Sequence, residues 1–471
     1  MTTPPPSMDN GADAISTSGV YPANDSGNAD RLLALFGPDF KHVEGVGWLR
    51  WRADLGCWRP DNKGPHYEAE LCSRLIVRDG QKMGLDDLEK WGRTSGNAAR
   101  ISAAVEILSH RPDVAVEAAA LDANPWLFNC ANGTIDLRTG ELRPHRREDL
   151  ITKRSPVVYA PGEVAAAPSC PRFMQFLSEC MAGDDELVAY LLRFLGYCLT
   201  GDVREHVLGL WHGGGRNGKS TLLEVMATVM GDYAVAVAPD LLLDTATQQH
   251  STGLTDLRGA RLATTVEPPA GRRWNESLVK QLTGGDRITA RRMRQDSITW
   301  APSHKLIMAC NGRPIVRDQG RAFWARLHAV PWGVSFEGRE DRELRGKLEA
   351  EASGILGMLV LGCRAWQAHG LCPPTSMSEA RDEYKESQDT IGQFVAERLV
   401  ESRDGFLPRA QLYADYREWA TTGGEHLLPA SVFYRHLDER RWDSAKRHGV
   451  RGYLGWSIRQ MSPLGVVRAQ S

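Results

Sequence analysis

The segment GGGRNGKS, residues 213–220, contains the residue types that bind a phosphate, in the order that phosphate binding requires. Glycines let backbone N–H groups curl around the anion, Lys219 reaches the β- and γ-phosphates, and Ser220 offers its hydroxyl to Mg²⁺. An apolar strand pattern precedes the loop and a leucine-rich helical pattern follows it, so the positive end of a helix dipole faces the anion. We therefore predict an ATP and Mg²⁺ site formed by Gly213, Gly214, Gly215, Arg216, Asn217, Gly218, Lys219, Ser220 and Thr221.

Four polar residues downstream are candidates for catalysis. A strand pattern ends at Glu267, whose carboxylate can orient Mg²⁺ or polarise the attacking water. A second apolar strand ends at Asn311, whose amide can hydrogen-bond the γ-phosphate or the water. Arg321 and Arg326 follow a loop, and one of them is a candidate arginine finger for a neighbouring subunit's nucleotide. Each has an ordinary alternative: a solvated glutamate, an Asn-Gly turn, or a surface arginine in a salt bridge.

Basic residues cluster around a predicted hairpin. Between Arg258 and Arg326 the sequence holds fourteen Lys or Arg and five Asp or Glu, an excess of nine in a chain of net charge −2. Binding to a phosphate backbone requires such local clustering, and tracking a single strand requires charge more than base readout. The alternative is a solvated charged hairpin. The predicted DNA-binding residues are Lys280, Arg287, Arg291, Arg292 and Arg294.

The elements that must position these residues indicate an α/β fold. Strand and helix patterns alternate up to about residue 335, which is typical of a mostly parallel sheet covered by helices. Upstream, a helical pattern spans about 66–110, and 127–145 reads as three strands joined by Asn-Gly and Thr-Gly turns. The predicted domains are a disordered tail (1–27), a mainly α N-terminal domain (28–160), a P-loop ATPase core (170–338), a helical extension (339–375), a winged-helix domain (385–462) and a tail (463–471).

The C-terminal region has the element order of a winged helix. Helical patterns at 390–401, 408–420 and 429–441 are followed by a strand-turn-strand pattern. A winged helix typically reads duplex DNA with its third helix, and a protein-docking module is the alternative. The basic residues near the predicted third helix and wing are Arg435, Arg440, Arg441, Lys446, Arg447 and Arg451.

Composition excludes several classes of protein. The nine cysteines are scattered without a CxxC pair, which argues against a disulfide framework or zinc site and favours a reducing compartment. No apolar run reaches the roughly 18 residues of a membrane span. The N-terminus lacks the basic and apolar segments of a signal peptide. We therefore expect a cytoplasmic protein, and the composition points weakly to a bacterial host with GC-rich DNA.

Taken together, the ordered motifs resemble those of superfamily 3 helicases within the AAA+ ATPases. The stretches that carry the resemblance are GGGRNGKST, LVKQLTGGDRITARRM, KLIMACNGRPIV, FWARLHAVPW and CANGTIDLRTGELRPH. The likeness is closest to phage and plasmid primase-helicases with a poxvirus-type C-terminal ATPase. It departs from the AAA+ pattern at Pro268, where many relatives have a second acid, and at Ala325-Arg326, where many have paired arginines.

The resemblance implies an ATP-dependent DNA helicase of a phage, prophage or plasmid replication system. It implies a hexameric ring on single-stranded or forked DNA with ATP between subunits, and Arg326 as the better finger candidate. The residues before the 131–140 signature lack a clear pair of catalytic acids, so we expect no primer synthesis and a separate primase or initiator as partner. The alternative from another class is an ATP-gated initiator or loader that does not unwind processively.

Overall fold

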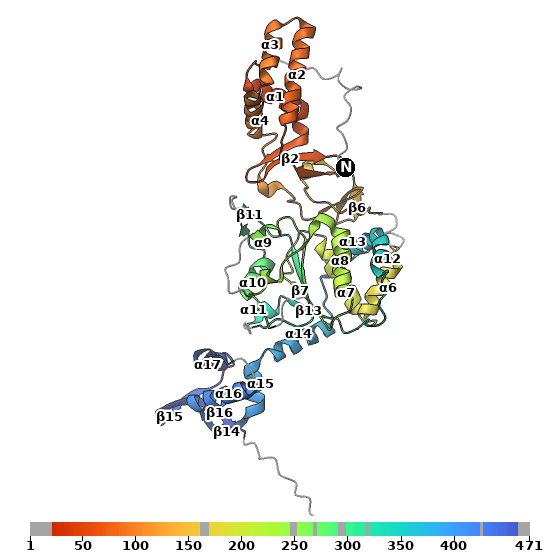
Figure 1. Cartoon of the computed structure of the whole chain (residues 1–471). Helices are drawn as coiled ribbons and strands as arrows, with labels where there is room; N and C mark the ends of the chain where they lie inside the picture. The colour runs from red at the N-terminus through yellow and green to blue at the C-terminus, as the bar shows by residue number, and fades with distance from the viewer. Residues whose placement is uncertain are drawn as a thin grey trace, which may run out of the picture. The chain divides into compact units, whose positions relative to one another are not determined.

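The computed structural model describes residues 21–160, 169–244, 252–266, 271–290, 298–316, 320–423 and 427–459. Within these residues the chain forms two compact units. The first comprises the chain up to Pro314 together with Ala325–Met377. The second comprises Ile315–Trp324 and the chain from Ser378 onward. Figure 1 labels the helices and strands of both.

The first unit begins with one helix, followed by a small antiparallel sheet in the order β1-β2-β3 and then by three further helices. The helices have buried faces that form one apolar cluster around Leu32 and Leu108. Gly84, with φ +67°, ends one of them, so the continuous helical stretch predicted over 66–110 is three separate helices. The elements are α1 (Asp25–Phe36), β1 (Phe40–Val43), β2 (Gly47–Arg52), β3 (Cys57–Pro60), α2 (His66–Met83), α3 (Asp86–Ser95) and α4 (Ala98–Ser109).

Order begins earlier than residue 28, so the predicted boundary of the N-terminal tail is wrong. Asn24 caps α1, because its side chain accepts a hydrogen bond from the Gly27 N–H at 2.8 Å. The buried Arg31 donates to the carbonyl oxygen of Tyr21 at 2.8 Å. Polar composition alone suggested disorder here, whereas a helix cap and a buried guanidinium hold the segment in place.

The three strands predicted over 127–145 are present as an antiparallel sheet, but they pack into the same hydrophobic core as the region predicted to be an ATPase. The Phe128 ring stacks on Tyr233 with 4.6 Å between centroids. The buried guanidinium of Arg261 donates to the Leu127 carbonyl at 2.6 Å. The predicted domain boundary at residue 160 therefore does not separate two hydrophobic cores. The strands are β4 (Leu127–Cys130), β5 (Gly133–Asp136) and β6 (Glu141–Arg143).

The centre of the first unit is a five-stranded parallel sheet in the order β13-β7-β12-β9-β8. Every residue of β7 and β12 is buried, as expected for a parallel sheet covered on both faces. The mixed α/β architecture with a parallel sheet agrees with the predicted fold class. The strands are β7 (Leu208–His212), β8 (Ala234–Ala236), β9 (Leu262–Val266), β12 (Lys305–Cys310) and β13 (Leu327–Pro331).

Helices from distant parts of the sequence cover this sheet (Figure 1). Helix α7 crosses α13 at two glycines: a Cβ at Gly196 would lie 2.2 Å from the Cys363 nitrogen, and one at Gly362 would lie 2.1 Å from the Leu192 oxygen. The predicted helical extension thus shares one hydrophobic core with the parallel sheet. The helices are α6 (Pro171–Cys180), α7 (Asp185–Cys198), α8 (Lys219–Met230), α9 (Thr252–Thr255), α10 (Glu276–Gly284), α12 (Leu344–Ala350) and α13 (Ala352–His369).

The second unit has three strands in the antiparallel order β14-β16-β15, with helices packed on them. Strand β14 was not predicted: the structure ends the first helix at Arg398 and places a strand where the sequence suggested helix and loop. The elements are α11 (Arg321–Trp324), α15 (Thr390–Arg398), β14 (Leu399–Pro408), α16 (Arg409–Gly423), α17 (Ala430–Glu439), β15 (Ser444–Arg447) and β16 (Val450–Ile458). Helix α14 (Thr375–Ser387) runs from the first unit into the second.

Candidate functional site

The Gly-rich loop joins β7 to α8, and two of its glycines are required by their surroundings. Gly213 has φ +159°, and a Cβ there would lie 2.1 Å from the Trp332 oxygen. Gly218 has φ +92°, and a Cβ there would lie 2.6 Å from the Cys180 sulfur. No described atom lies within 4 Å of a Cβ built at Gly214, so the middle of the loop is open. Both ends of the loop are therefore closely packed, while the backbone in its middle is accessible, as a phosphate-binding loop requires.

Lys219 is the first residue of α8 and is only 5% exposed. Its Nζ donates to the Gly213 oxygen at 2.8 Å, to Asn217 Oδ1 at 3.0 Å and to Asn311 Oδ1 at 3.4 Å. Asn217 is fixed in turn, because its Nδ2 donates to the Trp332 oxygen at 3.1 Å. The ammonium group is thus held inside the loop by oxygen atoms that a phosphate oxygen can replace.

Sheet topology brings Asn311 to the loop. Strand β12 lies between β7 and β9 and runs parallel to both, so the carboxyl ends of the three strands meet at one edge. The Gly213 N–H donates to the Cys310 oxygen at 3.3 Å, one residue before Asn311. Burial raises the pKa of the Cys310 thiol to about 11, so this group is neutral at physiological pH. Strand β9 ends at Val266 at this same edge, and Glu267, the next residue in the sequence, lies outside the described residues.

The described residues after Lys219 are placed at the start of α8. Ser220 is exposed in the first turn, and Thr221 lines the adjoining pocket. Arg216 has φ +56°, and its side chain forms ion pairs with Glu340 at 3.0 Å and Glu337 at 3.3 Å. These ion pairs link the segment that follows β13 to the Gly-rich loop.

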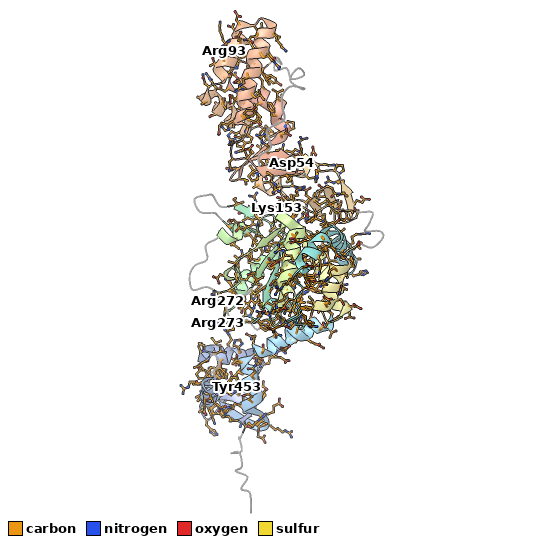
Figure 2. All side chains as sticks on the ribbon, turned by 45° about the vertical axis from the view of Figure 1, so that its right-hand side comes forward. Asp54, Arg93, Lys153, Arg272, Arg273 and Tyr453 are labelled. Carbon is orange, nitrogen blue, oxygen red and sulfur yellow. The ribbon has the colours of Figure 1, made fainter. Side chains whose placement is uncertain are left out.

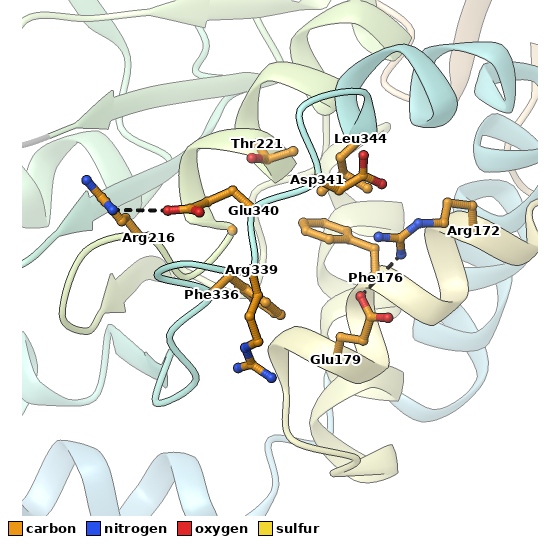
Figure 3. A pocket seen from close by; sticks show the side chains of 11 residues that line it. Arg172, Phe176, Glu179, Arg216, Thr221, Phe336, Arg339, Glu340, Asp341 and Leu344 are labelled. Carbon is orange, nitrogen blue, oxygen red and sulfur yellow. Dashed lines mark hydrogen bonds and ion pairs between the residues drawn. The ribbon is translucent and has the colours of Figure 1, made fainter.

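A pocket of about 440 Å³ adjoins the loop (Figure 3), and of its lining residues only Arg216, Gly218 and Thr221 were predicted as part of the site. Phe176 of α6, Phe336 and Leu344 supply apolar surface, while Gly218 and Thr221 belong to the loop and α8. The remaining lining residues are Arg172, Glu179, Arg216, Arg339, Glu340 and Asp341. Arg172 pairs with Glu179 at 3.3 Å. Helical periodicity predicts Phe176 as a core residue, and no sequence signal separates it from the other aromatic residues of the core.

The two arginine finger candidates lie in different units. Arg326 directly precedes β13, and its backbone oxygen accepts a hydrogen bond from Leu208 N–H at 2.8 Å. It is therefore at the amino edge of the sheet, whereas the Gly-rich loop is at the carboxyl edge. Arg321 is the exposed first residue of α11 and belongs to the second unit.

The predicted basic hairpin exists as an antiparallel pair, β10 (Ile288–Ala290) with β11 (Ile298–Trp300). Arg287 is exposed beside its first strand, and Lys280 lies on α10. The predicted tip residues Arg291, Arg292 and Arg294 lie outside the described residues.

Two of the fourteen basic residues counted between Arg258 and Arg326 stabilise the sheet and are unavailable to DNA. Arg261 is buried against Tyr233, with its guanidinium carbon 4.7 Å from the ring centroid. Lys305 is also buried, and burial lowers its pKa to about 7. Its Nζ donates to the Ser303 oxygen at 3.1 Å. The basic excess that reaches the surface is therefore smaller than the sequence count implies.

Two family comparisons match parts of the chain. Residues 29–182 match the family described as D5 N terminal like, and residues 211–322 match a family of unknown function, DUF5906. The first match extends past residue 160, in agreement with the shared core described above. Among the described residues, no helix is long and apolar enough to cross a membrane.

Curated relatives are viral proteins. A "Putative helicase" of Acanthamoeba polyphaga mimivirus is 27% identical over 343 residues, covering 68% of this chain and 36% of the relative. A "Putative helicase" of Frog virus 3 is 24% identical (65% and 40%), and a "Putative primase" of African swine fever virus is 25% identical (72% and 37%). The chain thus spans less than half the length of these relatives.

Among solved structures, the apo NrS-1 C terminal region has a TM-score of 0.55 at 10% identity, covering 92% of this chain and 99% of that one. This likeness concerns the fold alone. Residues 29–182 are therefore similar to the D5 N terminal like family, and about two thirds of the chain is similar to viral proteins named as helicases or primases.

Proposed function

We propose that this chain is an ATP-driven DNA helicase of superfamily 3 that acts in the replication of a mobile or viral genome. The observation that carries the proposal is the joint placement of Lys219, Asn217 and Asn311 around the open Gly-rich loop. These groups suit a γ-phosphate and its attacking water, and Ser220 suits Mg²⁺. The viral relatives support a replicative role, while the phage or plasmid origin and bacterial host remain predictions from the sequence.

The pocket beside the loop suits the base and ribose of the nucleotide. Its volume lies within the range of small-molecule sites, and the rings of Phe176 and Phe336 offer apolar faces for a purine. A nucleotide lying across Gly218 would have its phosphates in the loop and its base among these rings. ATP with Mg²⁺ is therefore the cofactor that we assign to the site.

The position of Arg326 supports action in a neighbouring subunit. Strand β13 has five residues, and at about 3.3 Å per residue it separates Arg326 from the loop edge by roughly 16 Å. A guanidinium at that edge is too far to contact a nucleotide of its own subunit. The position of Arg326 fits a ring with repeated head-to-tail contacts, in which the Arg326 of each subunit completes the nucleotide site of the neighbouring subunit. We propose that this ring is a hexamer.

DNA contacts are assigned to the β10–β11 hairpin and to the second unit. The seven residues that join β10 to β11 include Arg291, Arg292 and Arg294, which we propose to contact a single strand, together with Lys280 and Arg287. The second unit has the order helix, strand, two helices, two strands, with β14 paired to β16. We assign this order to a winged helix.

A strand-displacement assay on forked DNA tests the proposal against the alternative of an initiator or loader. A helicase displaces the labelled strand only with hydrolysable ATP and Mg²⁺. An initiator binds DNA in an ATP-dependent manner, seen by footprinting, without displacing a strand. ATP-dependent binding without displacement would therefore reject the helicase.

The pocket assignment predicts a selective loss of base binding in Phe336→Ala. Removing one aromatic face is expected to weaken ATP binding about 10-fold, since stacking on a base is worth about 1–3 kcal/mol. Binding of inorganic tripolyphosphate, which has no base, should be unchanged. Calorimetric titration of both ligands measures the difference, with Phe36→Ala in α1 as the matched control. Equal weakening of both ligands would place the base elsewhere.

A further inference from the structure

The hairpin formed by β15 and β16 is the most basic part of the second unit. Residues 444–458 contain Lys446, Arg447 and Arg451 and no acidic residue. All three side chains are exposed, as is His448 in the turn. No ion pair to any of the three is found within the part of the chain that the structure describes. In Figure 1 this hairpin projects beyond the helices of its unit.

Two of these cations oppose each other across the hairpin. Lys446 and Arg451 are direct Cα partners in the antiparallel register, so their side chains lie on the same face. Like charges in this position destabilise a hairpin. The neighbouring pair, Arg447 with Val450, presents the third cation on the opposite face, where the guanidinium lies 5.4 Å from the Phe406 ring centroid. Arg447 thus has an internal contact with an aromatic ring, whereas no acidic partner offsets the repulsion between Lys446 and Arg451 among the described residues. The three cations lie on both faces of the ribbon.

Helix α17, the expected reading helix, is a weaker candidate for contact with DNA. In the sequence it contains Arg435 but ends in Asp438 and Glu439. Asp438 accepts hydrogen bonds from Arg409 at 3.0 Å and from Tyr453 Oη at 2.9 Å. Figure 2 labels Tyr453, the buried residue of β16 through which the hairpin is anchored to this helix. The acidic end of α17 thus positions the hairpin.

We propose that the β15–β16 hairpin binds duplex DNA, entering a groove so that Lys446 and Arg451 reach the phosphates of one side and Arg447 those of the other. A two-stranded ribbon fits the major groove of B-form DNA, whereas the deep, narrow major groove of A-form RNA excludes side chains. The binding is independent of base sequence, because the three cations are assigned to phosphates, which are the same at every base pair. It does not require ATP hydrolysis, so it stands or falls separately from the helicase proposal.

The test uses the full chain without nucleotide and a blunt 20-base-pair DNA duplex, titrated at several salt concentrations. Each lost phosphate contact lowers the slope of log K against log salt by about 0.9. Lys446→Ala/Arg451→Ala is therefore expected to lower the slope by about 1.8 and to weaken binding at least 10-fold at 0.1 M salt. The charge-matched control is Arg403→Ala/Arg417→Ala, which removes two exposed arginines elsewhere in the same unit. This control should retain the wild-type slope.

A second variant separates binding from folding. Lys446→Glu converts the repulsive pair with Arg451 into an attractive cross-strand pair, so the thermal unfolding midpoint should not fall. Its affinity for the duplex should nevertheless fall about as far as that of the double alanine variant, because each variant lowers the charge of the hairpin by two. Wild-type affinity in Lys446→Glu, or a larger loss in Arg435→Ala than in the hairpin variants, would overturn the proposal. Equal losses on duplex RNA would likewise overturn groove binding.

Discussion

Lys219→Ala is expected to lower ATP turnover at least ~100-fold and to abolish strand displacement, because it removes the cation that neutralises charge on the transferred phosphoryl group. The Lys219 side chain is buried in the loop and contacts Gly213, Asn217 and Asn311. No group from the solvent therefore takes the place of its ammonium. Turnover is measured by phosphate release with saturating Mg²⁺, and displacement on forked DNA.

The control for this variant is Lys90→Ala, which removes an exposed lysine from α3. The Lys90 ammonium forms a surface ion pair with Asp87 at 3.7 Å. The control variant should retain full turnover. The thermal unfolding midpoints of both variants are measured as well. Midpoints equal to that of the wild type would show that the loss of activity does not come from a loss of structure. Turnover at the wild-type rate in Lys219→Ala would mean that the Gly-rich loop does not bind the reacting phosphates.

Arg326→Ala is expected to lower turnover about 10³-fold while leaving nucleotide binding intact, because an arginine finger stabilises only the transition state. The hydrogen bond from the Leu208 N–H goes to the backbone oxygen of this residue, so the substitution leaves that link to β7 in place. Arg321→Ala, in the second unit, is the comparison variant and should have a small effect.

Mixing the two inactive variants tests whether the finger acts between subunits. A site is active when Lys219 comes from one subunit and Arg326 from its neighbour. In randomly mixed rings of Lys219→Ala and Arg326→Ala chains, about one site in four regains both groups, since each interface is head-to-tail. Turnover should recover to about that fraction. If the mixed material forms rings and regains no activity, Arg326 does not complete a neighbouring site.

The part of the site that was predictable from the sequence is the part set by strand ends. The Gly-rich motif located Lys219, and an apolar strand ending in Asn311 located its partner, because parallel strands present their carboxyl ends at a common edge. The basic hairpin was likewise predicted, with its basic tip near residues 291–297, and β10 and β11 pair on either side of that segment. These features depend on local spacing, which a single sequence displays directly.

Features that depend on long-range packing were not predictable. Phe176 and Phe336 are far apart in sequence and meet only at the pocket. Strand β14 lacks alternation, because its register shifts between Glu401 and Phe406, so no period of two appears. A count of charged residues also could not predict the burial of Arg261 and Lys305, since such a count does not distinguish a buried basic residue from an exposed one.

Helices α7 and α13 cross at Gly196 and Gly362. Because of this crossing, the smallest fragment that can be expected to fold must include both helices. Backbone meets backbone there, so removing α13 uncovers the face of α7 that carries Leu192 and Gly196. A fragment ending at residue 338, the core boundary drawn from the sequence, should aggregate on expression. One that begins before Asn124 and ends after Met377 retains both the β4–β6 sheet and the helical cover, and should remain in solution.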